Sequence, residues 1–146
     1  MKTYSQKPAD VQRKWYVLDA SEVSLGRLST RAAALLLGKG KATVTPHTDG
    51  GDFVVEVNAG KVKVTGGKET KKDYFRHSGF PGGIYKRTFT EQQAKSPESI
   101  IYKAVRGMLP DNRLREGRLS RLKIYIDEEH NHAAQQPVKL SLKGSK

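Results

Sequence analysis

The sequence predicts an α/β fold with a mainly parallel sheet that helices cover on both faces. Short apolar runs typical of buried strands alternate with longer segments whose apolar residues recur every three or four positions. Strands that are separated by helices favour parallel pairing through helical crossovers. No internal repeat and no linker divides the 146 residues. We therefore expect a single domain over residues 1–146, with its core at about 14–126 and a C-terminal tail at 127–146.

The first predicted strand and helix lie near the N-terminus. The apolar run Trp15–Leu18 is followed by Asp19 and a turn, which is typical of a buried strand. Ser24 is a candidate N-cap for a helix over residues 25–37, whose leucines and alanines form one apolar stripe. Gly38 can adopt the left-handed conformation that often ends a helix.

Two further strands are predicted in the middle of the chain. Phe53–Val57 is an almost continuous apolar run, and Val62 and Val64 alternate with lysines, which indicates a strand with one solvated face. The connection near Gly60 is also short enough for an antiparallel hairpin, so the pattern alone leaves the direction of pairing open.

A second helix and a last strand are predicted in the C-terminal half. Ser96, Pro97 and Glu98 form a strong helix start, with an N-cap serine, a proline at the first helical position and an acid in the first turn. Apolar residues within 100–108 form the buried stripe of this helix, and Pro110 stops it. The last predicted strand carries Leu122, Ile124 and Ile126. The residues after it are expected to form an extended tail.

A strong excess of positive charge indicates an anionic partner. The chain has 27 lysines and arginines against 15 acidic residues, a net charge of +12 and a pI near 10.0. Such a protein attracts polyanions, of which nucleic acid is the commonest. A membrane-binding protein would concentrate its cations on an amphipathic helix. Here the first predicted helix lies in a nearly neutral region, whereas residues 61–90 carry eight basic residues and two acidic ones. We therefore expect nucleic acid and no membrane.

The sequence offers little support for a bound cofactor. The turn at residues 19–26 has no G-x-G-x-x-G pattern, and Gly66-Gly67-Lys68 lacks both the following Ser or Thr and the earlier glycine of a P-loop. Cysteine is absent, which excludes disulfides and thiolate metal sites. The N-terminal segment lacks the apolar core of a signal peptide. We expect a cytoplasmic protein that uses no cofactor and no small-molecule substrate.

The main alternative is a small metal-dependent enzyme that uses His47, Asp49 and Asp52. A histidine and two carboxylates can bind a metal or transfer protons. No nucleophile accompanies them, and a glycine turn whose aspartates bond local backbone amides explains them as well. His130 and His132 form a second metal-like pair, but a closed zinc site usually needs four ligands. Histidines in a basic tail more often stack on a base or bond a phosphate.

Residues 76–87, RHSGFPGGIYKR, fit contact with RNA better than catalytic chemistry. Two arginines and a lysine can neutralise phosphates, and three glycines let the backbone approach a sugar-phosphate chain closely. Phe80 and Tyr85 can stack on unpaired bases, or pack the segment against its own domain. Because the composition suits neither a regular helix nor a good strand, we expect a projecting loop.

Basic residues outside this segment extend the predicted interface. Lysines alternate with glycines at residues 38–41, and arginines are dense over residues 113–121. The planar guanidinium group grips phosphate through paired hydrogen bonds, which a point charge does not. Lys103 and Arg106 lie on the outer face of the second predicted helix, where RNA contact and simple solvation are equally good explanations.

Several short motifs, in order along residues 3–138, resemble the bacterial type of the universal ribosomal large-subunit protein thirteen family. They are LGRL at 25–28, TPH at 45–47, GD at 51–52, NA at 58–59, TG at 65–66, RHSGFPGG at 76–83, GMLP at 107–110 and AAQQP at 133–137. Each motif is weak, but the ordered set is highly specific. The resemblance implies a three-layer α/β/α domain with a four-stranded parallel sheet.

The same resemblance implies a structural, non-catalytic function. Members of this family bind large-subunit rRNA early in assembly and lie beside other large-subunit proteins in the cytoplasmic ribosome. Some members also bind mRNA and repress translation, which gives a possible second role. The candidate rRNA-binding residues are Lys39, Lys41, His47, Lys68, Lys71, Lys72, Arg76, His77, Gly79, Phe80, Gly82, Gly83, Tyr85, Lys86, Arg87, Arg106, Arg113, Arg115, Arg118, Arg121, His130, His132 and Gln135.

Overall fold

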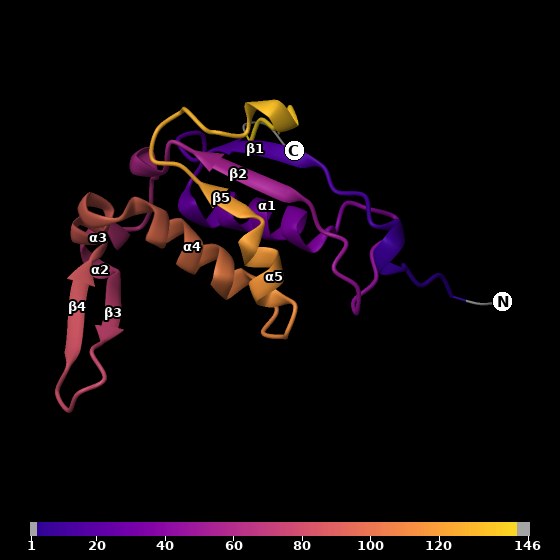
Figure 1. Cartoon of the computed structure of the whole chain (residues 1–146). Helices are drawn as coiled ribbons and strands as arrows, with labels where there is room; N and C mark the ends of the chain where they lie inside the picture. The colour runs from indigo at the N-terminus through magenta and orange to yellow at the C-terminus, as the bar shows by residue number, and fades with distance from the viewer. Residues whose placement is uncertain (1–2, 143–146) are drawn as a thin grey trace.

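The fold is built on a four-stranded parallel sheet (Figure 1). The computed structural model describes residues 3–142 of the chain. The strands are β1 (Trp15–Asp19), β2 (Phe53–Val57), β5 (Leu122–Ile124) and β6 (Val138–Lys139), in the order β5-β2-β1-β6. All three pairings between them are parallel. The predicted α/β class and four-stranded parallel sheet are therefore confirmed.

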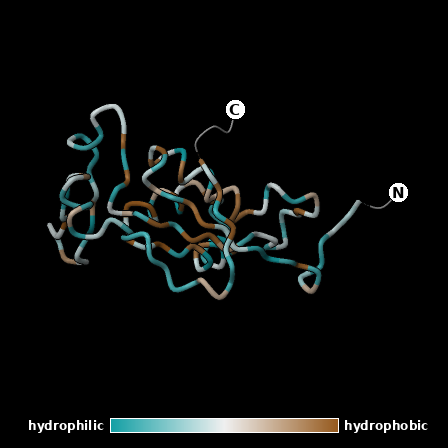
Figure 2. Tube along the Cα trace, turned by 90° about the horizontal axis from the view of Figure 1, so that it is seen from above, coloured by the Kyte–Doolittle hydropathy of each residue, from teal (hydrophilic) through white to brown (hydrophobic). Residues whose placement is uncertain are grey.

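Two long helices cover one face of this sheet. They are α1 (Leu25–Leu37) and α4 (Pro97–Met108), which also pack against each other. Leu18 and Val54 are fully buried in one cluster with the apolar stripes of both helices, including Leu28. Figure 2 shows the apolar stretches gathered in the middle of the domain. Both helices start as predicted, because the spacing of their apolar residues matches the helical period.

The C-terminal segment covers the other face. Val17 and Val55 point to this side and pack with Trp15 and Tyr125. After β5 the chain crosses over them, forms the 3-10 turn η3 (Ala133–Gln135) and returns to the sheet as β6. In Figure 1 this turn lies on the side of β1 opposite α1. The tail expected to be extended thus supplies the fourth strand.

Shorter elements connect these layers. They are the helices α2 (Lys68–Lys71), α3 (Phe89–Lys95) and α5 (Arg115–Ser120) and the 3-10 turns η1 (Pro8–Asp10) and η2 (Ala59–Lys61). Helix α3 begins with a capping box, in which the Glu91 backbone N–H donates to the Thr88 hydroxyl at 3.4 Å and the Thr88 N–H donates to the Glu91 carboxylate at 3.0 Å. This pattern fixes a helix start that the apolar spacing did not reveal.

An antiparallel hairpin projects from the domain beyond helices α3 and α4 (Figure 1). It consists of β3 (Asp73–His77) and β4 (Ile84–Thr88) and forms a sheet of its own. The segment predicted to be a loop does project, but its two ends are strands, so that part of the prediction is wrong. We call the whole of residues 73–88 the arm.

Two other predictions about strands are wrong. Val62 and Val64 form no strand; Val62 is buried in the core, and Lys63 makes a single isolated bridge with Ser24. The turn η2 directs the chain into the core here, so the antiparallel alternative near Gly60 is not formed by the described residues. Ile126 lies beyond the end of β5 and is 47% exposed. A short alternation of apolar residues can indicate that some of them are buried, but it does not show that the segment pairs with another strand.

Candidate nucleic-acid interface

Glycines shape the tip of the arm. Gly79 and Gly82 have φ angles of 92° and 73°, which residues with a Cβ rarely adopt. A Cβ on Gly83 would collide with the Ser78 hydroxyl. The Gly79 N–H donates to Nδ1 of His77 at 2.9 Å, which further orders the turn. The conformation of the tip thus requires these glycines whether or not RNA approaches them.

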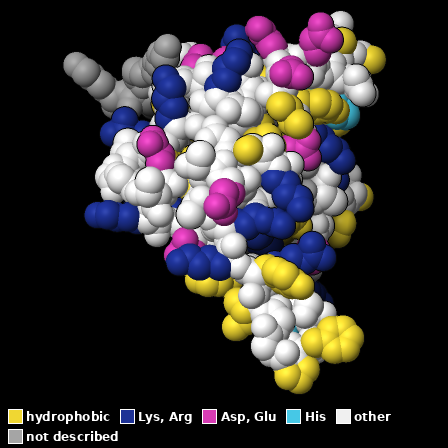
Figure 3. Space-filling model, turned by 90° about the vertical axis from the view of Figure 1, so that its left-hand side faces the viewer, with side chains coloured by type: hydrophobic (Ala, Val, Ile, Leu, Met, Phe, Trp, Pro, Cys, Tyr) yellow, Lys and Arg dark blue, Asp and Glu magenta, His cyan; other side chains and the backbone are white. Residues whose placement is uncertain are grey.

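The two faces of the arm carry different side chains, because the strand register places alternate residues on opposite faces. One face carries Tyr74, Arg76, Tyr85 and Arg87. The other face carries Phe75, His77, Ile84 and Lys86. Phe80, at the tip, is 75% exposed. Figure 3 shows apolar side chains gathered on the outer part of the arm and Lys and Arg side chains above them. Projecting aromatic and basic groups of this kind suit RNA, which offers both bases and phosphates.

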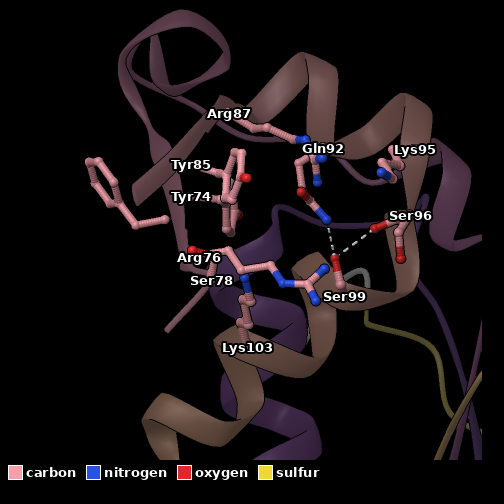
Figure 4. Close-up of a pocket in the computed structure, with 11 residues that line it drawn as sticks. Tyr74, Arg76, Ser78, Tyr85, Arg87, Gln92, Lys95, Ser96, Ser99 and Lys103 are labelled. Carbon is pink, nitrogen blue, oxygen red and sulfur yellow. Dashed lines mark hydrogen bonds between the residues drawn. The ribbon is translucent and has the colours of Figure 1, made fainter. Parts of the chain in front are cut away.

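A groove of about 640 Å³ separates the first face of the arm from helices α3 and α4. In Figure 4, Arg76 and Arg87 extend from the arm towards the helices, while Lys95 and Lys103 approach from the opposite side. The wall on the helix side is held by hydrogen bonds: the Gln92 side-chain amide donates to the Ser99 hydroxyl at 2.5 Å, and that hydroxyl donates to the Ser96 carbonyl at 2.8 Å. We call this space the arm groove.

Lys86 lies outside the groove and is partly neutralised. Its Nζ is 3.0 Å from a carboxylate oxygen of Asp73 on the neighbouring strand. The lysine side chain is 60% exposed. An exposed pair of this kind contributes little to stability, so Lys86 remains available to a phosphate.

Two arginines at the C-terminal end of helix α5 make internal contacts. Arg121 donates two hydrogen bonds to the Asp49 carboxylate, at 2.5 and 2.6 Å, and others to the Leu36 and Gly117 carbonyls. Arg118 lies 3.6 Å from the same carboxylate. Both arginines are almost fully buried. Their guanidinium groups hold α5 to the loop after α1, which explains both arginines without RNA.

The pKa of Asp49 reflects this arrangement. Burial by itself would raise the pKa of the carboxyl, but the hydrogen bonds and the charge of Arg121 outweigh burial and hold the pKa below its usual value. Asp49 is thus a stable anion inside the fold. A proton donor or acceptor near neutral pH would need the opposite shift.

Lys41 and Asp52 form a second internal ion pair. The Nζ of Lys41 is 2.6 Å from the Asp52 carboxylate and donates to the Gln12 and Gly50 carbonyls at 2.7 and 2.8 Å. Asp52 also accepts a hydrogen bond from the Lys14 backbone N–H at 2.8 Å. Lys41 therefore joins three segments of the chain, which explains its position without RNA. Lys39, by contrast, is exposed.

The tail histidines pack against aromatic rings of the sheet. The His132 ring lies 4.9 Å from Trp15 and 5.9 Å from Tyr125, and His130 lies 6.3 Å from Tyr125. Trp15 also stacks on Phe53 at 4.2 Å. Both histidines are half-buried, and their contacts with Trp15 and Tyr125 are tilted or edge-on. They contribute to covering the second face of the sheet.

The remaining predicted residues lie in several separate places. His47 is exposed, and its Nε2 is 3.2 Å from the Ser5 hydroxyl. Arg115 is mostly covered and pairs with Asp111 at 2.9 Å. The Lys72 ammonium group lies over the Tyr74 ring, 5.3 Å from its centre. Other predicted contacts that are exposed include Lys68, Lys71, Arg106, Arg113 and Gln135.

The geometry gives no support to the enzyme alternative. His47 bonds to a serine, and Asp49 and Asp52 are occupied by two different internal cations. Among residues 3–142, no group of three or more histidines and carboxylates is placed to hold a metal ion. No helix in the same range is long and apolar enough to cross a membrane.

Sequence patterns missed part of the groove. Its helix side contains Gln92 and Lys95, which no motif identified. The capping box at Thr88 and Glu91 is the signal that predicts helix α3 and would have placed both residues on it. Tyr74, at the base of the groove, was also missed, because neither charge nor a motif distinguishes a tyrosine that faces a groove from one in the core.

Comparison with known proteins agrees with this arrangement. The family model described as "Ribosomal protein L13" matches residues 13–131. The chain is 53% identical over 142 residues to "Large ribosomal subunit protein uL13" of Halorhodospira halophila. The aligned residues make up 97% of this chain and 100% of that protein. It is 52% identical to the Neisseria gonorrhoeae protein of the same name, over 98% of this chain and 100% of that protein. The chain therefore belongs to the ribosomal protein L13 family.

Proposed function

We propose that this chain is a structural constituent of the large ribosomal subunit that binds large-subunit rRNA early in assembly and stabilises its fold. Its family is one of structural ribosomal proteins and not of enzymes. The names of its relatives refer to the large ribosomal subunit, and the chain aligns with them over nearly its full length. In this role the protein works in the cytoplasm, beside other proteins of the subunit.

The observation that carries the proposal is the projecting arm. A compact domain held by internal ion pairs presents two antiparallel strands whose exposed side chains are mostly basic or aromatic. Arg76 and Arg87 make no ion pair with any residue that the structure describes. An extended surface of basic and aromatic side chains does not stabilise the fold by itself. RNA offers phosphates that pair with the basic groups and bases that stack on the aromatic rings. The comparisons give no support to a second role in binding mRNA.

The test is a titration of protein-free large-subunit rRNA with the full chain across salt concentrations, with unrelated RNA as competitor. If about six to eight phosphates are neutralised, the log–log salt slope is roughly −5 to −7. Replacing Arg76, Lys86 and Arg87 by alanine is expected to weaken binding and to reduce the slope by about 0.9 for each phosphate that is no longer neutralised. The thermal unfolding midpoint is expected to stay the same.

The matched control removes three exposed cations outside the arm, Lys7, Arg27 and Arg31. It changes the net charge by the same amount, so it separates a local contact from a general loss of potential. Equal weakening in both variants would contradict a specific role for the arm. Binding that does not survive competition by unrelated RNA would contradict recognition of rRNA. Binding to rRNA without other ribosomal proteins present is the behaviour expected of an early assembly component.

A further inference from the structure

The arm groove is lined with four cations. Arg76, Arg87, Lys95 and Lys103 all border it. None of the four makes an ion pair with a residue in the described part of the chain. None of the eleven lining residues, all of which the structure describes, is acidic. Four positive groups around one concave space create a local potential that favours a phosphate.

A buried hydroxyl at the base of the groove also has no partner. Tyr74 is 8% exposed, and its hydroxyl oxygen makes no hydrogen bond within residues 3–142. The ammonium groups of Lys72 and Lys103 each lie 5.3 Å from the centre of its ring. Burial raises the pKa of Tyr74, so the hydroxyl keeps its proton at neutral pH. A buried donor without an acceptor costs free energy, and a ligand that supplies the acceptor removes this cost.

An exposed aromatic ring forms another side of the groove. Tyr85 lies on the same face of the arm as Tyr74 and is 59% exposed. In Figure 4 both tyrosines come from the strands of the arm, opposite the side chains that come from the helices. A tyrosine ring left in solvent beside a cluster of cations offers a surface on which a base can stack.

We propose that the arm groove holds one unpaired nucleotide of the bound RNA, with its phosphate among Arg76, Arg87, Lys95 and Lys103 and its base against Tyr85. The hydroxyl of Tyr74 donates a hydrogen bond to the sugar or base. The volume of about 640 Å³ lies within the range of roughly 300–1,000 Å³ typical of small-molecule sites. The inference depends on the proposed binding of rRNA and adds to it the site of a single unstacked residue.

An unpaired nucleotide fits better than a duplex. In an A-form helix the bases are stacked on each other and their faces are closed to the protein. Contact with Tyr85 therefore requires a base that has left the stack, at a bulge, loop or strand end. The phosphate of that nucleotide can also come from a free mononucleotide, so the experiment distinguishes the two sources.

The experiment measures rRNA affinity and photocrosslinking for four variants of the full chain. Tyr85→Ala is expected to raise the Kd by about five- to 150-fold, the usual effect of losing one stacked base. The salt slope stays unchanged, because the variant keeps every cation. Tyr85→Phe keeps the ring and restores nearly wild-type affinity. Tyr4→Ala is the matched control, since Tyr4 is similarly exposed, at 57%, and does not line the groove.

Ultraviolet crosslinking of the wild-type complex identifies the residue in contact. The expected adduct joins Tyr85 to one nucleotide that chemical probing finds unpaired in the free rRNA. Tyr74→Phe, which removes only the hydroxyl, is expected to weaken binding with no change in the thermal unfolding midpoint. Millimolar adenosine monophosphate is expected to leave rRNA affinity unchanged.

The outcomes separate this inference from the proposed function. If the wild-type chain binds rRNA but Tyr85→Ala and Tyr4→Ala have the same affinity, the groove site is wrong and the rRNA function stands. If adenosine monophosphate competes fully with rRNA, the groove is a mononucleotide site and the inference is overturned. If the wild-type chain does not bind rRNA, both proposals fail together.

Discussion

At the residue scale, the most unusual group in the core is Glu56. It lies in β2 between Val55 and Val57 and is completely buried. Neither carboxylate oxygen has a hydrogen-bond partner among residues 3–142. Burial without a compensating charge raises the pKa of this carboxyl to about 8. Glu56 is thus a neutral acid in the folded protein at pH 7 and an anion in the unfolded chain.

This difference makes stability depend on pH in a predictable direction. The folded state holds the Glu56 proton between its ordinary pKa of 4.5 and about 8, so the free energy of unfolding falls as pH rises through that window. At about 1.4 kcal/mol per unit of pKa, the loss is at most about 5 kcal/mol. We expect Glu56→Gln to be increasingly more stable than the wild type from pH 5 to pH 9. Urea denaturation of both proteins at each pH measures the difference, and a constant difference would contradict the assignment.

Asp49 and Arg121 show the opposite electrostatic case, a buried pair with good geometry. Removing the arginine leaves a buried carboxylate with little compensation, which typically costs about 3–5 kcal/mol. We expect Arg121→Ala to lose stability of that size by urea denaturation at pH 7. Because the pKa of Asp49 is lowered, the contribution of the pair is present above its ordinary pKa of 3.8 and is lost only on acidification through a lower value.

The same variant separates the fold from RNA contact. The buried position of Arg121 predicts that rRNA affinity per folded molecule is unchanged when its side chain is removed. A large fall in affinity of a fully folded Arg121→Ala protein would contradict the structural role assigned to it.

At the element scale, the apolar stripe of α1 supports the sheet. Leu28 is fully buried between this helix, α4 and the strands. Leu28→Ala removes three carbon atoms and leaves a cavity, so we expect a loss of about 2–4 kcal/mol in the free energy of unfolding. Arg27, its exposed neighbour on the same helix, is the control, and Arg27→Ala is expected to change stability by less than about 0.5 kcal/mol. Equal effects of the two substitutions would contradict the assigned orientation of the helix.

The elements that the sequence predicts well are those with one buried face. The bounds of α1 and α4 agree with the predicted ones because their apolar residues follow the helical period. The strands of the arm escaped prediction because neither has a face buried along its whole length. The strand β6 has two residues, and its pairing with β1 depends on tertiary structure alone.

The candidate interface was predictable for a related reason, and only in part. The local density of charge located the arm correctly as a basic projection. It could not distinguish Arg121 from Arg87, because the acid that neutralises Arg121 lies 72 positions earlier in the chain. A basic residue is available to RNA only if no acidic residue of the same fold pairs with it, and the sequence alone does not show such pairs.

At the scale of the whole molecule, the fold separates stability from binding. The cations that hold the domain together, at Lys41, Arg118 and Arg121, are covered and paired. The four cations that border the arm groove make no ion pair with a residue in the described part of the chain. Substitutions in the arm can therefore alter RNA affinity while the core keeps its unfolding temperature, which is the behaviour that the alanine variants of the arm test.

The order of the strands has a consequence for synthesis of the protein. The first strand, β1, pairs with the last, β6, and the Leu140 N–H donates to the Val17 carbonyl at 3.0 Å. A growing polypeptide therefore cannot close this edge of its sheet until residue 140 has left the exit tunnel. Until then Trp15 and Val17 lack the cover of the C-terminal segment. An interrupted translation product would thus expose an open strand edge, which marks it for chaperones and proteases.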